Sequence, residues 1–434
     1  MSLHRRSVLG GAALAALATS ARAQTPPAAP PPAQPSLEDR YAQAARANRM
    51  RLAWDGRRFS GPGWDFLARE ASAAQFLLLG EDHFIAEIPR LAGQLYRDGG
   101  YQRASIEISP PSAGMIDAAL RDGGLEGLTR WQREHPTGVA FYNLRTEAEF
   151  LADVRAATPG RGPVIWGTDY EMGADRALIS RLKQVAPAPA RAAVQAMQDA
   201  SLASWRHYGA TGDFLSIFPF GGDPQLVRAV RATWPAPDEE ARLILDTLET
   251  TLVVNGHYRA ERYYLSNQTR ADFQRASFLR HWRRERTAGA RPKVLLKYGW
   301  NHVVRGLSYT YNFDLGSLVS ELAEIEGGRA FRVLAIGGPG ARQGVFNPAE
   351  WKAVPTAVES FDKHAMTPVA GQHFETGFTV IDLRPLRLLP ASKADPRMIR
   401  IVHGFDALVV LPGATANDFL LPPPALAEIG ASER

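Results

Sequence analysis

The sequence predicts an α/β protein with a mainly parallel or mixed central sheet, flanked by helices, and with a helical insertion that covers the carboxyl ends of the strands. Two observations predict this class. Short, continuous apolar runs alternate with segments that carry apolar residues at helical spacing, as expected for strands buried on both faces. Residues from about 173 to 290 then contain no convincing strand and have the pattern of successive helices. Strands that alternate with helices are typical of a parallel sheet.

The first 36 residues precede the predicted folded domain. Arg5 and Arg6, a weakly apolar stretch and an A-x-A site predict a twin-arginine signal peptide over residues 1–23. We therefore expect export to the periplasm by the twin-arginine translocation machinery. The apolar stretch is too short to span a bilayer, and no later run predicts a membrane span, so the exported protein is expected to be soluble. Residues 24–36 form a Pro/Ala-rich linker, and the folded domain is predicted over residues 37–434.

Charge and cysteine content exclude several classes of protein. Removal of the predicted signal peptide takes away three arginines and no acidic residue, so the net charge falls from +5 to +2. That balance gives no case for a nucleic-acid partner. The chain has no cysteine, which excludes iron–sulfur clusters and zinc sites with cysteine ligands.

The elements are predicted from their apolar spacing and from the residues that end them. A strand over 76–80 is followed by a helix over 86–98, which stops at Gly99 and Gly100. The later predicted strands are 105–108, 164–169, 294–299, 331–337, 378–383 and 407–411. Further helices are predicted from residue 111 and over 146–157, 174–185, 190–207, 224–233, 238–254 and 258–286.

Polar residues with chemical potential follow the first predicted strand. Glu81 and His83 lie two residues apart, so both side chains can point to one side of an extended segment. A carboxylate beside an imidazole orients the ring and makes it more basic, as a general base or a metal ligand requires. The alternative is a loop with ordinary surface charges.

Two acids occupy comparable positions on later strands. Glu107 lies between Ile106 and Ile108, and an ionised carboxylate beside an apolar layer needs a partner, a metal or a raised pKa. A structural salt bridge is its alternative. Asp169 follows Gly167 and Thr168 at the end of the third strand, where it is predicted to bind substrate or, alternatively, to cap the next helix.

The remaining candidates come from the second half of the chain. His302 follows the strand over 294–299 and is predicted as a second acid/base. Lys297 stands inside the apolar run of that strand. A capping or core histidine is the alternative. Asn301 is predicted to bind substrate, as is Arg270, which stands out from the arginines of the helix over 258–286. Those arginines otherwise predict a solvated face.

These motifs resemble the erythromycin esterase-like superfamily, which also includes ChaN-type haem-binding lipoproteins and, more remotely, the TIKI/TraB metalloproteases. The resemblance rests on G-E-D-H at 80–83, Glu107, G-T-D at 167–169, and Gly-Trp-Asn-His at 299–302, and it spans about residues 70 to 412. It implies that Glu81, His83, Glu107 and His302 occupy the family's acid and base positions. Here a single residue separates Glu81 from His83, whereas erythromycin esterases have two, and this spacing is closer to that of the ChaN branch.

The resemblance implies two alternative functions for these residues. The first is an exported hydrolase that opens an ester, lactone or amide of a small molecule with water activated by His83, with Glu81 orienting the ring. Glu107 would hold the water or a divalent metal, and Mn²⁺, Co²⁺ or Zn²⁺ would suit Glu81, His83, Glu107 and His302 as ligands. The alternative is a periplasmic haem- or iron-binding protein of the ChaN type without turnover, in which His83 or one of Tyr96, Tyr170 and Tyr298 ligates iron.

Overall fold

A nine-stranded mixed sheet forms the centre of the computed structural model, which describes residues 34–139, 141–160 and 162–432. The predicted signal peptide and most of the linker lie outside the described residues. The strand order is β2 (Phe59–Ser60), β1 (Arg49–Trp54), β10 (Phe378–Asp382), β11 (Ala407–Leu411), β7 (Ala330–Gly337), β3 (Phe76–Glu81), β6 (Val294–Gly299), β4 (Arg103–Ile106) and β5 (Ile165–Gly167). The predicted α/β class with a mixed sheet is confirmed.

The six strands from β11 to β5 are parallel, and β10, β1 and β2 join them through antiparallel ladders. All seven predicted strands are present, with ends that differ by a few residues. Strand β4 ends at Ile106, so Glu107 lies directly after the strand rather than inside it. Strands β1 and β2 were not predicted, because the Arg-rich run of β1 lacks a continuous apolar pattern.

Helices cover both faces of the sheet because successive side chains of each central strand point to opposite sides. Leu77 and Leu79 of β3 pack into one core, whereas Phe76 and Leu78 pack into another. The first core is shared with α2 (Pro62–Ala73), α3 (Glu87–Asp98), α4 (Pro110–Glu134) and α5 (Arg145–Ala157). The second is shared with α1 (Leu37–Ala47), α11 (Tyr263–Thr287), α12 (Trp300–Val303), α13 (Leu315–Ile325), α14 (Thr367–Ala370) and α15 (Pro396–Gly404).

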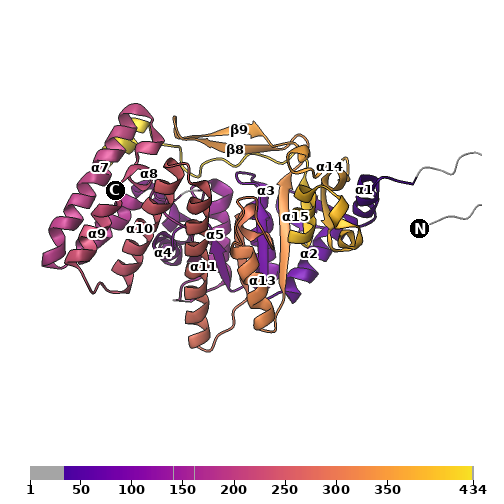
Figure 1. The fold of residues 1–434 in the computed structure, drawn as a ribbon, viewed down its shortest axis with the longest axis horizontal. Helices are drawn as coiled ribbons and strands as arrows, with labels where there is room; N and C mark the ends of the chain where they lie inside the picture. Colours follow the sequence, from indigo (N-terminus) through magenta and orange to yellow (C-terminus); the bar gives the residue numbers. More distant parts are fainter. Residues whose placement is uncertain (1–33, 140, 161, 433–434) are drawn as a thin grey trace, which may run out of the picture. The chain divides into compact units, whose positions relative to one another are not determined.

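The predicted helical segment has its own core and gathers at one end of the sheet, seen on the left of Figure 1. It comprises α6 (Asp175–Val185), α7 (Arg191–Thr211), α8 (Phe218–Gly221), α9 (Pro224–Thr233) and α10 (Glu239–Arg259), and it continues into α11. Helix α11 contacts β5 at the edge of the sheet and brings Arg270 to the strand ends.

The second sheet is a hairpin that the sequence analysis missed. Strands β8 (Arg342–Asn347) and β9 (Lys352–Ala357) pair antiparallel and run along the top of Figure 1. Their side chains are mostly partly exposed or exposed, so they lack the continuous apolar run that identified the buried strands. The remaining elements are α16 (Leu426–Ala431) and five short 3-10 turns at Ala188–Ala190, Phe214–Ser216, Phe361–His364, Arg384–Leu388 and Ala391–Lys393. Among the described residues, no helix combines the length and apolar character needed to cross a bilayer.

Candidate active site

Three neighbouring strands end at one point of the sheet, and the candidate site is built on their carboxyl ends. Glu81 is the last residue of β3, Glu107 follows β4, and Gly299 is the last residue of β6. Because β6 pairs in parallel with both β3 and β4, these three ends meet at the same edge of the sheet. This edge is where α/β folds bind their ligands.

Glu81 and His83 form a carboxylate–imidazole pair. His83 Nδ1 lies 2.9 Å from Glu81 Oε1, so the ring donates through Nδ1 and presents Nε2 to the cleft. The ring of Phe141 stacks on the imidazole with centroids 4.6 Å apart, which fixes its plane. Burial lowers the pKa of His83, but the carboxylates of Glu107 and Glu81 outweigh it, so the pKa lies above its ordinary value of 6.5.

Glu107 is the central carboxylate of the site. Its Oε1 accepts a hydrogen bond from Arg270 Nη2 at 2.6 Å, and its Oε2 accepts one from the Gly299 N–H at 2.7 Å. The Nε2 atoms of His83 and His302 lie 3.6 Å and 3.5 Å from its two oxygens. Burial raises the pKa of Glu107, but His302, His83 and Arg270 outweigh it and lower the pKa to about 2. Glu107 is therefore an anion at neutral pH.

His302 belongs to a second carboxylate–imidazole pair. Its Nδ1 lies 2.7 Å from Asp314 Oδ2, and Asp314 is also the N-cap residue of α13. Burial and Arg270 lower the pKa of His302, but Asp314 and Glu107 outweigh them and raise it. Two imidazoles, each held at Nδ1 by its own carboxylate, thus lie near different oxygens of Glu107.

Arg270 joins the helical segment to the strand ends. Its Nε lies 2.9 Å from Asp169 Oδ1, and its Nη2 bonds both Asp169 and Glu107. The guanidinium also lies over the ring of Tyr170, 4.9 Å from the centroid. Asp169 is 2% exposed and contacts the cleft through Arg270. The pKa of Arg270 is raised because these acids outweigh its burial, so it keeps its charge.

The buried Lys297 forms ion pairs with two acids, Glu81 and Glu147. Lys297 Nζ lies 2.6 Å from Glu81 Oε2 and 2.7 Å from Glu147 Oε1, and the lysine is 1% exposed. Burial raises the pKa of Glu81, but Lys297 and His83 outweigh it and lower the pKa. Burial raises the pKa of Glu147 to about 7, and Lys297 only partly opposes this. The two acids therefore differ: Glu81 stays ionised while Glu147 titrates near neutral pH.

A cleft of about 630 Å³ is lined by Glu81, His83, Glu107, Arg270 and His302, whereas Asp169, Glu147, Lys297 and Asp314 lie behind its surface. Asn301, predicted to bind substrate, lines it too, but its amide donates to Thr310 Oγ1 at 3.2 Å and accepts from the Tyr309 N–H at 2.8 Å. Gln343 and Val345 of β8 complete one wall. At the floor, a Cβ on Gly299 would lie 2.7 Å from His83 Nε2, so this position needs glycine for the ring to approach the strand.

The residues as arranged do not fit a divalent metal. The described part of the chain contains no group of three or more His, Asp or Glu side chains placed to hold one. Instead, Lys297 faces Glu81 and Arg270 faces Glu107, so the carboxylate charge is balanced by protein cations. For the iron-binding alternative, the hydroxyls of Tyr96 and Tyr298 lie in the core, bonded to Thr158 and to Ser105 and Thr168.

The structure brings together all four residues predicted for catalysis, with Arg270 and Asp169 beside them. Sequence reasoning missed Lys297, Glu147 and Asp314 as members of the site. Lys297 carried a usable signal, since it is a charge inside an apolar strand, as Glu107 was expected to be. Glu147 and Asp314 carried none, because each stands near the start of a helix, where acids are common.

The fold is similar to that of three solved structures. A protein from Bacillus cereus aligns with a TM-score of 0.57 at 12% identity, over 89% of this chain and 100% of its own. A mutant of the erythromycin esterase EreC in its open conformation aligns with a TM-score of 0.55 at 14% identity, over 86% of this chain and 99% of its own. A succinoglycan biosynthesis protein aligns with a TM-score of 0.56 at 12% identity, over 89% and 100%.

No protein-family model and no curated protein sequence matches the chain. The structural likeness supports an erythromycin esterase-like fold. The ChaN-type and TIKI/TraB parts of the resemblance gain no support from it.

Proposed function

We propose that this protein is a hydrolase that cleaves an ester, lactone or amide with water activated by His83. The observation that carries the proposal is the pair of carboxylate-held imidazoles, Glu81–His83 and Asp314–His302, that face Glu107 in one cleft. An imidazole fixed at Nδ1 and open at Nε2 is suited to take or give a proton at a defined point. The erythromycin esterase-like fold agrees with this chemistry.

In the proposed reaction, water lies between His83 Nε2 and the carbonyl carbon of the substrate. His83 takes one proton from the water as its oxygen attacks the carbon, and the carbonyl oxygen becomes an oxyanion. The tetrahedral intermediate collapses, the bond to the leaving group breaks, and His302 gives that group a proton. The products are a carboxylic acid and an alcohol or amine, or the opened chain of a lactone.

The charges around Glu107 explain why both histidines suit this chemistry. Glu107 raises the pKa of each ring. In the proposed reaction, His83 acts in its neutral form as the base and His302 acts in its protonated form as the acid. Arg270 has its side chain 19% exposed to the cleft and keeps its charge, so it supplies positive potential for the oxyanion. No metal enters this sequence of steps.

The test is His83→Ala assayed with an activated ester such as p-nitrophenyl acetate. We expect kcat/KM to fall by at least ~10²-fold, the low end for a positioned general base. His207→Ala is the matched control, because His207 is exposed on α7, away from the cleft. A His83→Ala protein that stays folded and hydrolyses the ester at the wild-type rate contradicts the proposal.

We also propose that the protein is exported through the twin-arginine pathway and acts in the periplasm. The support is the arginine pair and the A-x-A site of the predicted signal peptide. Replacement of Arg5 and Arg6 by lysine should leave the precursor in the cytoplasm, because the pair is read as an address. Cell fractionation and immunoblotting measure this, and an unchanged periplasmic yield would contradict it.

A further inference from the structure

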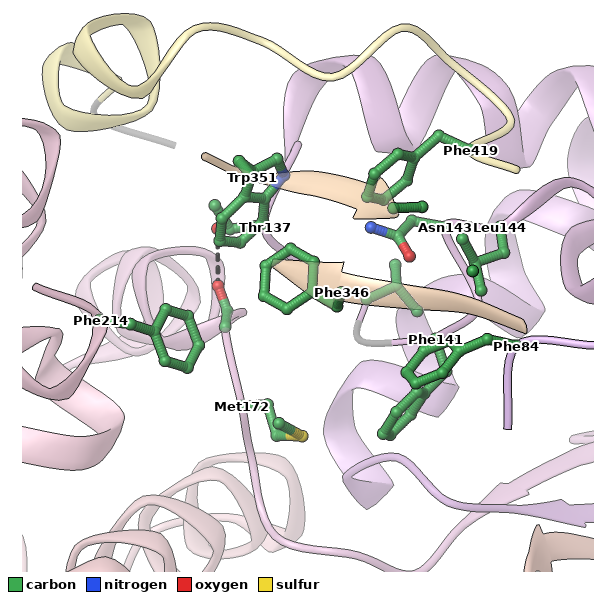
Figure 2. Close-up of a pocket in the computed structure, with 14 residues that line it drawn as sticks. Phe84, Thr137, Phe141, Asn143, Leu144, Met172, Phe214, Phe346, Trp351 and Phe419 are labelled. Atoms are coloured by element: carbon green, nitrogen blue, oxygen red, sulfur yellow. Dashed lines mark hydrogen bonds between the residues drawn. The ribbon is translucent and has the colours of Figure 1, made fainter. Parts of the chain in front are cut away.

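A second cavity, of about 250 Å³, lies next to the polar cleft and is apolar. Six aromatic side chains, from well-separated parts of the sequence, converge on it in Figure 2: Phe84, Phe141, Phe214, Phe346, Trp351 and Phe419. None of the described residues that line it is charged. Two of its polar side chains are Thr137 and Asn143. The Thr137 hydroxyl donates to the Gly173 carbonyl at 2.7 Å, and Asn143 also lines the space beside the proline-rich segment near the C-terminus.

The apolar cavity and the polar cleft have a common wall. Phe84, Phe141 and Met172 line both of them. Phe141 is also the ring that stacks on His83, so a group held in the apolar cavity would lie on the far side of this ring from the imidazole. The hairpin faces both spaces as well, because Gly344 and Phe346 line the cavity while the alternate residues Gln343 and Val345 line the cleft.

The backbone of this wall is strained. Phe84 and Phe141 have φ angles of 72° and 64°, in the left-handed region that bulky residues rarely adopt. The Phe84 carbonyl is held there by the N–H groups of Gly344 and Asn417, at 3.0 Å and 2.9 Å. Such strain persists where the surrounding structure enforces it, and it clusters at ligand sites. Here it places two aromatic rings between the imidazole and the apolar space.

Resting on the proposed hydrolase function, we propose that this cavity binds the apolar group of the substrate while the scissile carbonyl lies at His83. A dry apolar cavity of about 150 Å³ accommodates benzene. A space of about 250 Å³ therefore suits an uncharged group of roughly eight to ten carbon atoms, such as a medium-length acyl chain or a fused pair of aromatic rings. A charged group is disfavoured, because no described side chain of opposite charge lines the cavity.

The first experiment measures kcat/KM for p-nitrophenyl esters from acetate to dodecanoate. The values should rise with acyl length, by up to about fourfold per methylene, and level off near eight to ten carbons. Ala353→Phe places a ring in the cavity from β9 and should flatten this dependence. Lys352→Phe adds the same ring at the neighbouring exposed position, which lines neither space, and should keep the wild-type slope.

A second variant covers the case in which Ala353→Phe fails to fold. Phe346→Ala enlarges the cavity from β8 and should move the preferred acyl length upward by two or more carbons. An ester series with the same slope in the wild type, Ala353→Phe and Phe346→Ala overturns the proposal.

The second experiment separates the cavity from the chemistry by measuring binding of 2-naphthol through its fluorescence. Wild type and His83→Ala should bind it equally, whereas Ala353→Phe should bind at least tenfold more weakly. Binding with this pattern but no ester hydrolysis would leave the cavity assignment standing and remove the hydrolase proposal. Hydrolysis that depends on His83, with no binding of 2-naphthol to the wild type, would leave the hydrolase proposal standing and remove the cavity assignment.

Discussion

Lys297→Met removes the cation that lies buried between Glu81 and Glu147. At N···O distances of 2.6 Å and 2.7 Å, each carboxylate attracts Lys297 by about 6 kcal/mol at an effective dielectric constant of 20. Much of this attraction offsets the desolvation of the ions, and breaking a buried pair typically costs about 3–5 kcal/mol. We therefore expect the free energy of unfolding to fall by about 3–5 kcal/mol at neutral pH.

The cost of Lys297→Met should grow with pH. Without the cation, burial holds the pKa of both carboxyls above the unfolded values near 4.5, so the folded state disfavours their ionised forms. Below pH 4.5 both groups are protonated whether the chain is folded or unfolded, and the penalty is small. Stability is then lost as the pH rises through the raised folded values. Guanidinium unfolding at pH 5 and pH 8 measures the difference.

Two further variants make this prediction refutable. Lys293→Met is the matched control: Lys293 donates to the backbone carbonyls of Ser72 and Gly99, so its loss should cost about the same at both pH values. Adding Glu147→Gln to Lys297→Met should recover part of the stability at pH 8, because one uncompensated acid is gone. A Lys297→Met cost below about 1 kcal/mol that is equal at pH 5 and pH 8 would refute the reasoning.

Three other predictions concern the chemistry. Asp314→Asn should lower kcat for an activated ester at least about tenfold, because the amide no longer stabilises the protonated imidazole of His302. Circular dichroism should be unchanged, and an unaltered kcat would exclude His302 as the acid. Glu107→Gln should lower kcat/KM at least ~10²-fold and cost about 1–3 kcal/mol in guanidinium unfolding, since its guanidinium and amide partners lose a charged acceptor. In the wild type, kcat/KM should fall as the pH drops through a value above 6.5, because Glu107 and Glu81 outweigh burial and raise the pKa of His83. In Glu107→Gln this acidic limb of the pH profile should move to lower pH. An acidic limb that stays in place would show that Glu107 does not set the pKa of His83.

The sequence predicted the central strands because they are buried on both faces. Runs such as the one that ends at Gly80 or Gly299 are apolar without interruption, and that pattern depends only on local composition. The same logic identified Glu107, a charge predicted inside an apolar run, although the strand ends one residue before it. Strand β1 and the β8–β9 hairpin have exposed, charged or polar positions, so local composition does not distinguish them from loops.

The supporting groups of the site depended on tertiary placement. Glu147 reaches Lys297 only because α5 packs beside the strand ends, and Asp314 reaches His302 only because α13 begins there. Nothing in the eleven residues between His302 and Asp314 indicates that the two side chains meet. The apolar cavity was equally hidden, since its aromatic residues are spread from Phe84 to Phe419.

The β8–β9 hairpin has a consequence for how this protein can be altered. The ion pairs and dyads of the cleft come from the ends of the central strands and the residues just after them, with Glu147 from α5, Arg270 from α11 and Asp314 from the start of α13. A side chain at Gly299 would disturb several of these charges together. The hairpin belongs to a separate two-stranded sheet and contributes uncharged wall positions at Gly344, Phe346 and Ala353. Exchange of residues 345–357 therefore offers a route to new substrate preferences that leaves the reacting groups in place, so that one short segment can diversify under selection while the rest of the chain stays constant.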